Sequence, residues 1–378
     1  MASRYIQRGA RLPNSEPGDE ALMQANAAHA RAMPLARMLD NGMRFADALA
    51  LHRMAEAGVP WVAAGTWLGE RNLACADAAP GRTAEAQHCI AASACFRFAQ
   101  SAHVLDTPER LRLYRRVIDS FARGAALLPA PPTRIEVPVG SGALCGWLFH
   151  PVGADRAARP VVMVFGGADG WRESYYTMVA PLSEEGLSVC LLDGPGQGES
   201  RLFQGVYLRP GFEAMFESVA AKLRQTHSAV GVWGNSLGGS LAFAIAAASP
   251  AIDAVCANGG SARPSEIIER YPRVLDRIAA MTGHHGRAAA AGLLTGLDLI
   301  DRLPRITCPV LVLHGGQDAL FPVESAEPLH DLVASDDREM VIWDDGEHCL
   351  YTHAAERNLL AASWFATRLR AAAERRRQ

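Results

Sequence analysis

The sequence of 378 residues lacks several features that would point to particular partners. Its 37 basic and 40 acidic side chains leave a net charge of only −3, so no excess of positive charge is available for binding nucleic acid. It contains no uninterrupted run of about 18 apolar residues, the length that a membrane span requires. We therefore expect neither nucleic acid nor a membrane as a partner.

The eight cysteines are scattered, and no two of them form a C-x-x-C pair. This spacing disfavours a zinc site or a redox motif, so we expect no metal and no cofactor. Residues Met1 to Arg8 contain no apolar segment of the kind found in secretory signals, which favours a cytoplasmic location.

What the sequence does contain is a serine in a G-x-S-x-G frame, Gly234-Asn235-Ser236-Leu237-Gly238. An apolar run ending at Trp233 precedes it, and a helix-forming run over 240–248 follows it. A serine on such a sharp turn from strand to helix is held out at the top of a sheet, and the glycines avoid collisions there. The first N–H groups of the helix then point at the group that the serine attacks. We identify Ser236 as the candidate nucleophile.

An acid and a histidine follow the serine in chain order. The apolar run 309–313 leads into a Gly-Gly turn that ends at Asp318, and the run 340–343 is followed by His348. A serine hydroxyl is a poor nucleophile at neutral pH and needs a base within hydrogen-bond reach. We predict that His348 accepts the proton of Ser236, while Asp318 orients the imidazole and stabilises its cation.

Two other histidines are rival candidates for the base. His314 lies inside the end of the predicted strand, where a structural role is favoured, and His353 is expected in the helix that follows His348. Neither stands directly after a strand end, as His348 does, so His348 is the favoured candidate.

A second donor for an oxyanion is expected from the loop after an earlier strand. Residues 161–165 have the composition of a buried strand, and the Gly-rich loop 166–170 follows it. We predict that the N–H groups of Leu237 and of either Ala168 or Gly167 form the oxyanion hole. A further Gly- and Pro-rich segment, 193–200, is interpreted as a structural crossover loop beside the site.

The first 128 residues contain no convincing strand, and their apolar side chains recur at the three- and four-residue spacing of helices. We predict helices near 19–33, 35–57, 84–104 and 107–127. The Pro-rich segment 128–132 marks a boundary, so residues 1–128 are expected to form a helical lid or dimerisation region. Residues 129–378 are expected to form the catalytic domain.

Beyond the boundary, segments 134–139 and 143–150 are predicted to form a β-hairpin. From Val161 onward strands alternate with helices, which indicates a parallel sheet covered on both faces. The segment of about 262–303 is predicted to be a helical insertion. The fold class is therefore α/β, with a mostly parallel central sheet and an all-helical N-terminal lid or cap region.

Taken together, these motifs resemble the α/β-hydrolase superfamily, and within it the FrsA-like and Ayg1-like branch. That branch includes 2,6-dihydroxypseudooxynicotine hydrolase and fungal hydrolases that shorten polyketides. The resemblance covers roughly residues 130 to 370 and is carried by the segments Gly166-Gly167, Asp193 to Glu199, Gly234 to Gly239, Asn258-Gly259-Gly260, His314 to Asp318 and Gly346 to Cys349.

The resemblance implies a reaction class and further candidate residues. Members of this branch cleave a C–C bond next to a ketone, and some carry an acidic residue shortly after the strand that follows the serine's helix. In this sequence Glu266 or Glu269 would match that residue. Glu266 and Asp169 are accordingly candidates for a substrate-binding or acid–base role.

Three hypotheses for the function follow. The first is a hydrolase that needs no cofactor and uses Ser236 to cleave a C–C bond next to a ketone, or an ester, in an aromatic or polyketide-like small molecule. The second is a lyase, because the chain is similar at the superfamily level to enzymes of tetronate pathways that eliminate acetate. The third, a non-catalytic binding module, is disfavoured because all three triad positions are filled. A homodimer is compatible with each.

Overall fold

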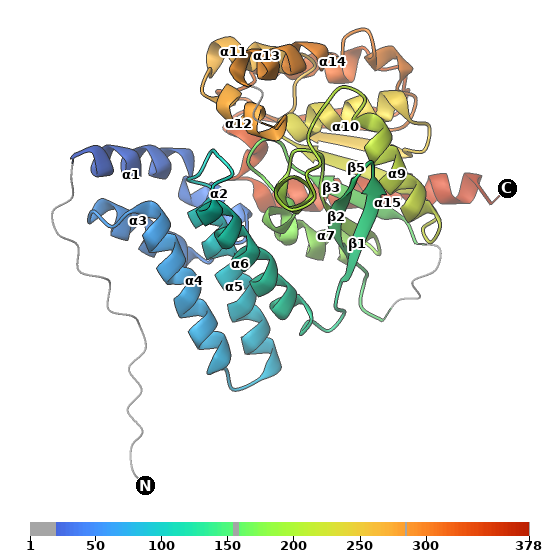
Figure 1. Ribbon diagram of the computed structural model, residues 1–378. Helices are drawn as coiled ribbons and strands as arrows, with labels where there is room; N and C mark the ends of the chain where they lie inside the picture. The colour runs from blue at the N-terminus through green and yellow to red at the C-terminus, as the bar shows by residue number, and fades with distance from the viewer. Residues whose placement is uncertain (1–19, 154–158, 284–285, 378) are drawn as a thin grey trace. The chain divides into compact units, whose positions relative to one another are not determined.

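The computed structural model describes residues 20–153, 159–283 and 286–377 (Figure 1). The chain divides into two compact units, and each is formed by discontinuous segments. The first unit comprises the described part of 1–39 together with 43–103 and 112–127. The second comprises 40–42, 104–111 and the described part of 128–378.

The second unit is built around one eight-stranded sheet with the order β1-β2-β4-β3-β5-β6-β7-β8. Strands β1 and β2 form an antiparallel hairpin, β2 pairs antiparallel with β4, and the remaining pairs are parallel. The predicted α/β fold with a mostly parallel sheet is confirmed. The strands are β1 (Thr133–Val139), β2 (Gly142–Phe149), β3 (Val161–Phe165), β4 (Ser188–Asp193), β5 (Val230–Asn235), β6 (Ala254–Asn258), β7 (Val310–Gly315) and β8 (Arg338–Trp343).

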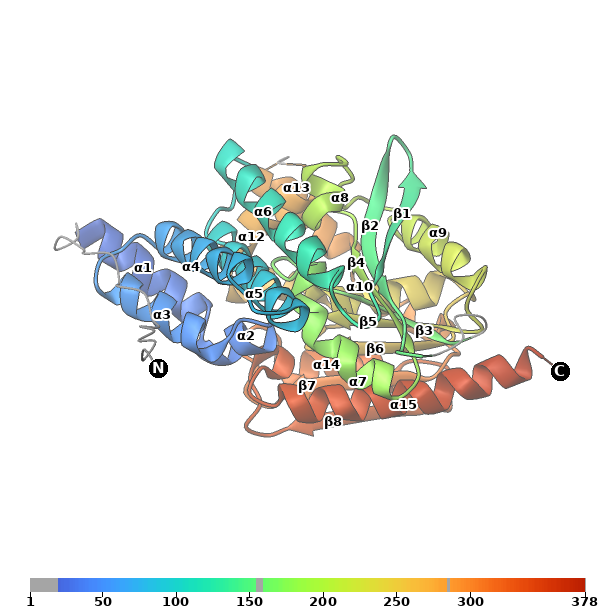
Figure 2. The ribbon, with the colours of Figure 1, turned by 90° about the horizontal axis from the view of Figure 1, so that it is seen from below.

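The central strands are buried along their whole length, as all residues of β3, β4, β5, β6 and β7 are. Strands covered on both faces have continuous apolar sequences, which is the composition of β3 and of residues 310–313 in β7. Figure 2 shows α7 (Val179–Glu184) and α15 (Ala354–Arg375) on one face of the sheet, and α9 (Glu213–Arg224) and α10 (Leu237–Ala248) on the other.

Short helices fill the connections of this unit. They include η1 (Arg172–Met178) after β3, α8 (Gly198–Leu202) after β4, α14 (Val323–Asp331) after β7 and η4 (His348–Leu350) after β8. Between β6 and β7 the chain forms η2 (Pro264–Glu266), α11 (Ile267–Arg270), α12 (Val274–Met281), α13 (Gly286–Gly296) and η3 (Leu303–Arg305).

The N-terminal region is helical, as predicted, but its helix boundaries differ from the prediction. It contains α1 (Glu20–Ala32), α2 (Leu35–Asp40), α3 (Phe45–Glu56), α4 (Trp61–Asp77), α5 (Arg82–Gln100) and α6 (Pro108–Ala125). The prediction of one helix over 35–57 is wrong, because the chain turns at Gly42, which has a φ of +82°.

Helix α4 was not predicted at all. Its sequence contains Gly65 and Gly69, which lower intrinsic helix propensity. These glycines permit close packing against α5, since a Cβ on Gly69 would lie 2.5 Å from the ring of Phe96 and one on Gly65 would lie 2.9 Å from Cβ of Ala99. Tertiary packing therefore stabilises a helix that local propensity does not indicate. Within the described residues, no helix is both long and apolar enough to span a bilayer.

Candidate active site

Ser236 occupies a strained turn between β5 and α10. Its φ and ψ of +59° and −131° are unusual for a residue with a side chain. The flanking glycines are sterically required, because a Cβ on Gly234 would lie 1.9 Å from the Gly238 carbonyl oxygen. A Cβ on Gly238 would lie 2.5 Å from the carbonyl oxygen of Gly166. The G-x-S-x-G sequence thus provides the space that this turn needs.

The structure brings the three predicted triad side chains together. His348 Nε2 lies 2.8 Å from Ser236 Oγ, and His348 Nδ1 lies 2.7 Å from Asp318 Oδ2. The other carboxylate oxygen of Asp318 accepts the N–H groups of Leu320 at 2.8 Å and Phe321 at 3.0 Å. Asp318 is therefore held in place by its own turn, and it presents one oxygen to the imidazole.

The surroundings shift the pKa values of this pair in opposite directions. Burial disfavours the carboxylate of Asp318, but His348 and the backbone N–H of Phe321 outweigh it, so the pKa of Asp318 is lowered. Burial also disfavours the imidazolium of His348, but the adjacent Cys349 side chain and the Asp318 carboxylate favour it more strongly. The pKa of His348 is therefore raised above its ordinary value of 6.5. The raised pKa makes His348 a stronger base toward the serine hydroxyl, although only its neutral form can accept the proton.

The two rival histidines lie in other environments. His314 is fully buried at the end of β7, where its Nε2 donates to the Phe321 carbonyl at 2.8 Å. Burial lowers the pKa of His314, so it stays neutral and supports the turn that carries Asp318. His353 Nε2 lies 3.0 Å from a carboxylate oxygen of Asp345. Of the three histidines, His348 is the one that reaches Ser236.

The loop after β3 lies directly beside the first turn of α10. A Cβ on Gly167 would lie 2.8 Å from the backbone nitrogen of Leu237. The backbone at Gly167 therefore passes close to the N–H that was predicted as an oxyanion donor, while the next residue, Ala168, is half-buried. The two backbone segments are thus close enough for the predicted oxyanion hole to be formed between them.

Gln197 holds this loop, although the sequence analysis did not single it out. Its side-chain nitrogen donates to the carbonyl oxygens of Gly166 and Gly167, the latter at 3.0 Å, and its oxygen accepts the N–H of Gly194 at 2.8 Å. Gln197 is fully buried. The segment 193–200, interpreted as a crossover loop, therefore also supports the loop 166–170 after β3.

The two candidate acidic residues form polar contacts of their own. Glu266 is half-buried and accepts a hydrogen bond from the hydroxyl of Ser325, whereas Glu269 is exposed. Asp169 forms an ion pair with Arg277 of α12, with a distance of 2.5 Å between Oδ1 and Nη1. This ion pair connects the loop after β3 with the helical segment between β6 and β7. Across the described part of the chain, no three His, Cys, Asp or Glu residues are grouped as metal ligands.

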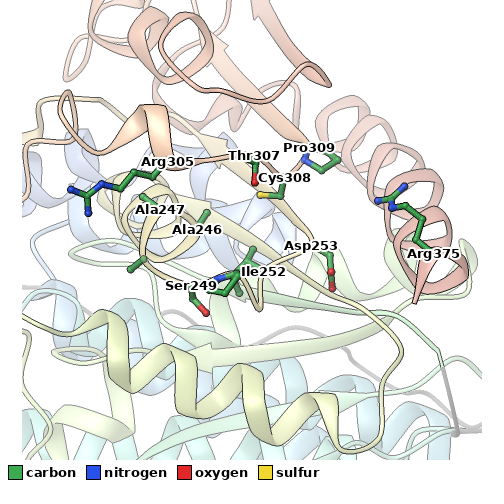
Figure 3. A pocket seen from close by; sticks show the side chains of 12 residues that line it. Ala246, Ala247, Ser249, Ile252, Asp253, Arg305, Thr307, Cys308, Pro309 and Arg375 are labelled. Carbon is green, nitrogen blue, oxygen red and sulfur yellow. The ribbon is translucent and has the colours of Figure 1, made fainter. Parts of the chain in front are cut away.

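A cavity of about 320 Å³ lies away from these residues (Figure 3). It is lined by residues next to the starts of β6 and β7, among them Asp253, Cys308 and Pro309. Because these strands are parallel, their starts lie at the edge of the sheet opposite to the ends that carry Ser236 and Asp318. The cavity is therefore not part of the candidate active site.

Comparisons with known proteins agree with this geometry. The model of the alpha/beta hydrolase family matches residues 161–358. The chain is 25% identical over 285 residues to 2,6-dihydropseudooxynicotine hydrolase of Paenarthrobacter nicotinovorans, covering 73% of this chain and 74% of the relative. It is 29% identical to hydrolase LUC6 of a Fusarium species, covering 61% of this chain and 66% of the relative.

Solved structures show the same fold. The crystal structure of 2,6-dihydroxy-pseudo-oxynicotine hydrolase has a TM-score of 0.79 at 24% identity and covers 88% of this chain and 95% of its own. The structure of wild-type AbyA5 has a TM-score of 0.69 at 19% identity, and the match covers 92% of this chain and 98% of the AbyA5 chain. The resemblance predicted from the sequence motifs is confirmed.

Replacing Asp318 with Asn should change the pH dependence of the reaction as well as its rate. Only the neutral imidazole can accept the serine proton, so kcat/KM should rise with pH through the pKa of His348, at a midpoint above 6.5 in the unmodified protein. Without the carboxylate that pKa falls, so the rising limb should move to lower pH while kcat drops by about 10³- to 10⁴-fold. An unchanged midpoint in the variant would show that Asp318 does not act on the base.

Replacing Gly167 with Ala should weaken the oxyanion hole. The added methyl group would displace the loop from Leu237, and losing one donor costs on the order of 10²-fold in kcat. Gly292→Ala is the matched control, because no atom lies within 4 Å of its Cβ position in α13. This control should retain its kcat and gain slightly in Tm. Equal rates for the two variants would exclude the loop from the reaction.

Proposed function

Because the chain belongs to the alpha/beta hydrolase family, we propose that it is a serine-dependent hydrolase. It cleaves a C–C bond next to a ketone, or an ester, in an aromatic or polyketide-like small molecule. The observation that carries this proposal is the hydrogen-bonded chain Ser236 to His348 to Asp318, with distances of 2.8 and 2.7 Å. In such a chain the neutral imidazole takes the proton of the attacking serine, and the carboxylate stabilises the imidazolium that forms.

The reaction would proceed in two stages. Ser236 Oγ attacks the substrate carbonyl carbon as His348 takes its proton, and the N–H of Leu237 with a donor from Gly167 or Ala168 stabilises the oxyanion. The bond from that carbon to the departing carbon or oxygen then breaks, and the imidazolium protonates the leaving atom. In the second stage His348 deprotonates a water molecule, which attacks the acyl-serine. The proton returns to Ser236 as the carboxylic acid leaves.

The names of two relatives support the proposed substrate class. The relative from Paenarthrobacter nicotinovorans is named for its action on 2,6-dihydropseudooxynicotine, and the alignment covers about three quarters of both chains, with 73% and 74%. The Fusarium relative carries the general name of a hydrolase.

In the same proposal, Glu266 and Asp169 contact the substrate or move a proton. Residues 1–128 serve as a lid or a dimerisation element, and sedimentation of the purified protein tests the dimer.

Ser236→Ala should abolish turnover and leave the fold intact, since it removes the attacking oxygen and no backbone contact. A fluorophosphonate probe should label Ser236 in the unmodified protein, as detected by mass spectrometry of its peptides, and should fail to label the variant. Undiminished turnover by the variant would refute the serine mechanism.

Solvent labelling distinguishes hydrolysis from elimination. In water enriched in heavy oxygen, a hydrolase should place one solvent oxygen in the released acid, because water attacks the acyl-serine. A lyase that expels an acetate group would place none there. Acid released without solvent oxygen would therefore favour the acetate-eliminating reaction on the same fold.

A further inference from the structure

The turn that follows His348 is strained. Cys349 and Leu350 have φ values of +63° and +58°, a left-handed conformation that residues with side chains rarely adopt, and both residues are buried. Such conformations persist only where surrounding contacts hold them. The position of the imidazole thus depends on whatever holds this turn.

Two side chains hold the carbonyl group of Cys349. Arg357 Nη1 donates to it at 2.6 Å, and Asn258 Nδ2 donates to it at 3.1 Å. Arg357 comes from the first turns of α15 and is completely buried, while Asn258 is the last residue of β6. Two donors from different elements therefore converge on the residue next to His348.

Arg357 is itself oriented by an acidic residue from the N-terminal region. Its Nη2 donates to Asp40 Oδ1 at 2.8 Å and its Nη1 to Asp40 Oδ2 at 3.2 Å, while Asn358 Oδ1 accepts from Nε at 3.1 Å. Asp40 belongs to the same compact unit as the sheet and is 7% exposed. Because the guanidinium is planar, two bonds to one carboxylate fix the direction in which Nη1 points.

Asn258 connects this assembly with the nucleophile. Its carbonyl oxygen accepts the N–H of Ser236 at 2.8 Å, and its side-chain nitrogen donates to Asn235 Oδ1 at 2.9 Å as well as to Cys349. One residue thus contacts both the turn that carries the serine and the turn that carries the histidine. The distance between Ser236 Oγ and His348 Nε2 depends on both contacts.

We propose that Asp40 and Arg357 are positioning residues, which hold the Cys349 carbonyl so that His348 stays within hydrogen-bond reach of Ser236. This inference rests on the proposed serine mechanism. It assigns to a residue near the start of the chain a role in the reaction, 317 positions away from its partner. Neither residue touches the reacting atoms.

Two conservative variants test the proposal. Asp40→Asn keeps the size of the side chain and removes its charge. Arg357→Lys keeps the charge, but an ammonium group cannot hold the Cys349 carbonyl and both carboxylate oxygens in one plane. In both variants the rate constant for fluorophosphonate labelling of Ser236 should fall on the order of 10- to 100-fold at neutral pH, and kcat should fall with little change in KM.

A matched control comes from the opposite edge of the sheet. Arg224 likewise donates to a backbone carbonyl, that of Ala251 at 3.1 Å, and to a buried carboxylate, that of Asp253 at 2.6 Å. All four variants should lower Tm, but Arg224→Lys and Asp253→Asn should leave the labelling rate and kcat unchanged. A loss of labelling in these controls would mean that stability alone explains the effect, and would overturn the proposal.

The position of the imidazole can also be measured without catalysis, by NMR titration of His348. If the turn relaxes, the bond to Asp318 weakens, and the pKa of His348 should fall in both variants. If the pKa of His348 falls in Asp40→Asn alone, the effect is purely electrostatic and the positioning role is overturned. Labelling of both variants at the wild-type rate would also overturn it. Failure of the unmodified protein to label would refute the proposed function, and the titration would then decide the positioning role by itself.

Discussion

The parallel pairing of β5, β6, β7 and β8 is the constraint on which the candidate site depends. Parallel neighbours end at the same edge of a sheet. The register pairs Asn235 with Asn258 at the ends of β5 and β6, and Gly315 with Trp343 at the ends of β7 and β8. The turns after these strands therefore emerge side by side, although Ser236 and His348 are 112 positions apart in the chain. Ligands of open α/β sheets bind at this edge for the same reason.

Backbone strain is concentrated at the edge of the sheet that carries Ser236 and His348. Among the residues that the structure describes, the non-glycine residues with positive φ are Ser236, Cys349 and Leu350. Each such conformation costs about 1–3 kcal/mol and must be compensated by its surroundings. The contacts of Asn258 and Arg357 meet this requirement. Buried ion pairs contribute little net stability because charged groups lose their hydration, but they restrict geometry strongly. The ion pair of Arg357 with Asp40 is suited to restricting the geometry of the turn after His348.

The sequence predicted the parts of the structure whose local residue pattern directly reflects their place in the fold, such as buried strands. The buried strands have continuous apolar runs, and β3 was predicted with the bounds that the structure shows, Val161–Phe165. The proximity of Ser236, Asp318 and His348 also followed from chain order and strand ends. The arginine at 357 could not be found in this way, because its partner Asp40 lies 317 positions away and neither residue belongs to a local motif. Helix α4 was missed because its stability comes from close packing against α5.

Polar side chains at the carboxyl ends of the strands recur as supports for the loops. Asp193, the last residue of β4, accepts the N–H groups of Arg172 and Glu199, each at 2.9 Å, and thereby connects the segment after β3 with the segment after β4. Asn235 donates to the Phe165 carbonyl at 3.3 Å from the end of β5. Loops that leave a sheet lose the ladder of backbone hydrogen bonds, so their buried N–H and C=O groups need other partners. Side chains at the strand ends supply those partners, and in doing so they determine where the reacting groups stand.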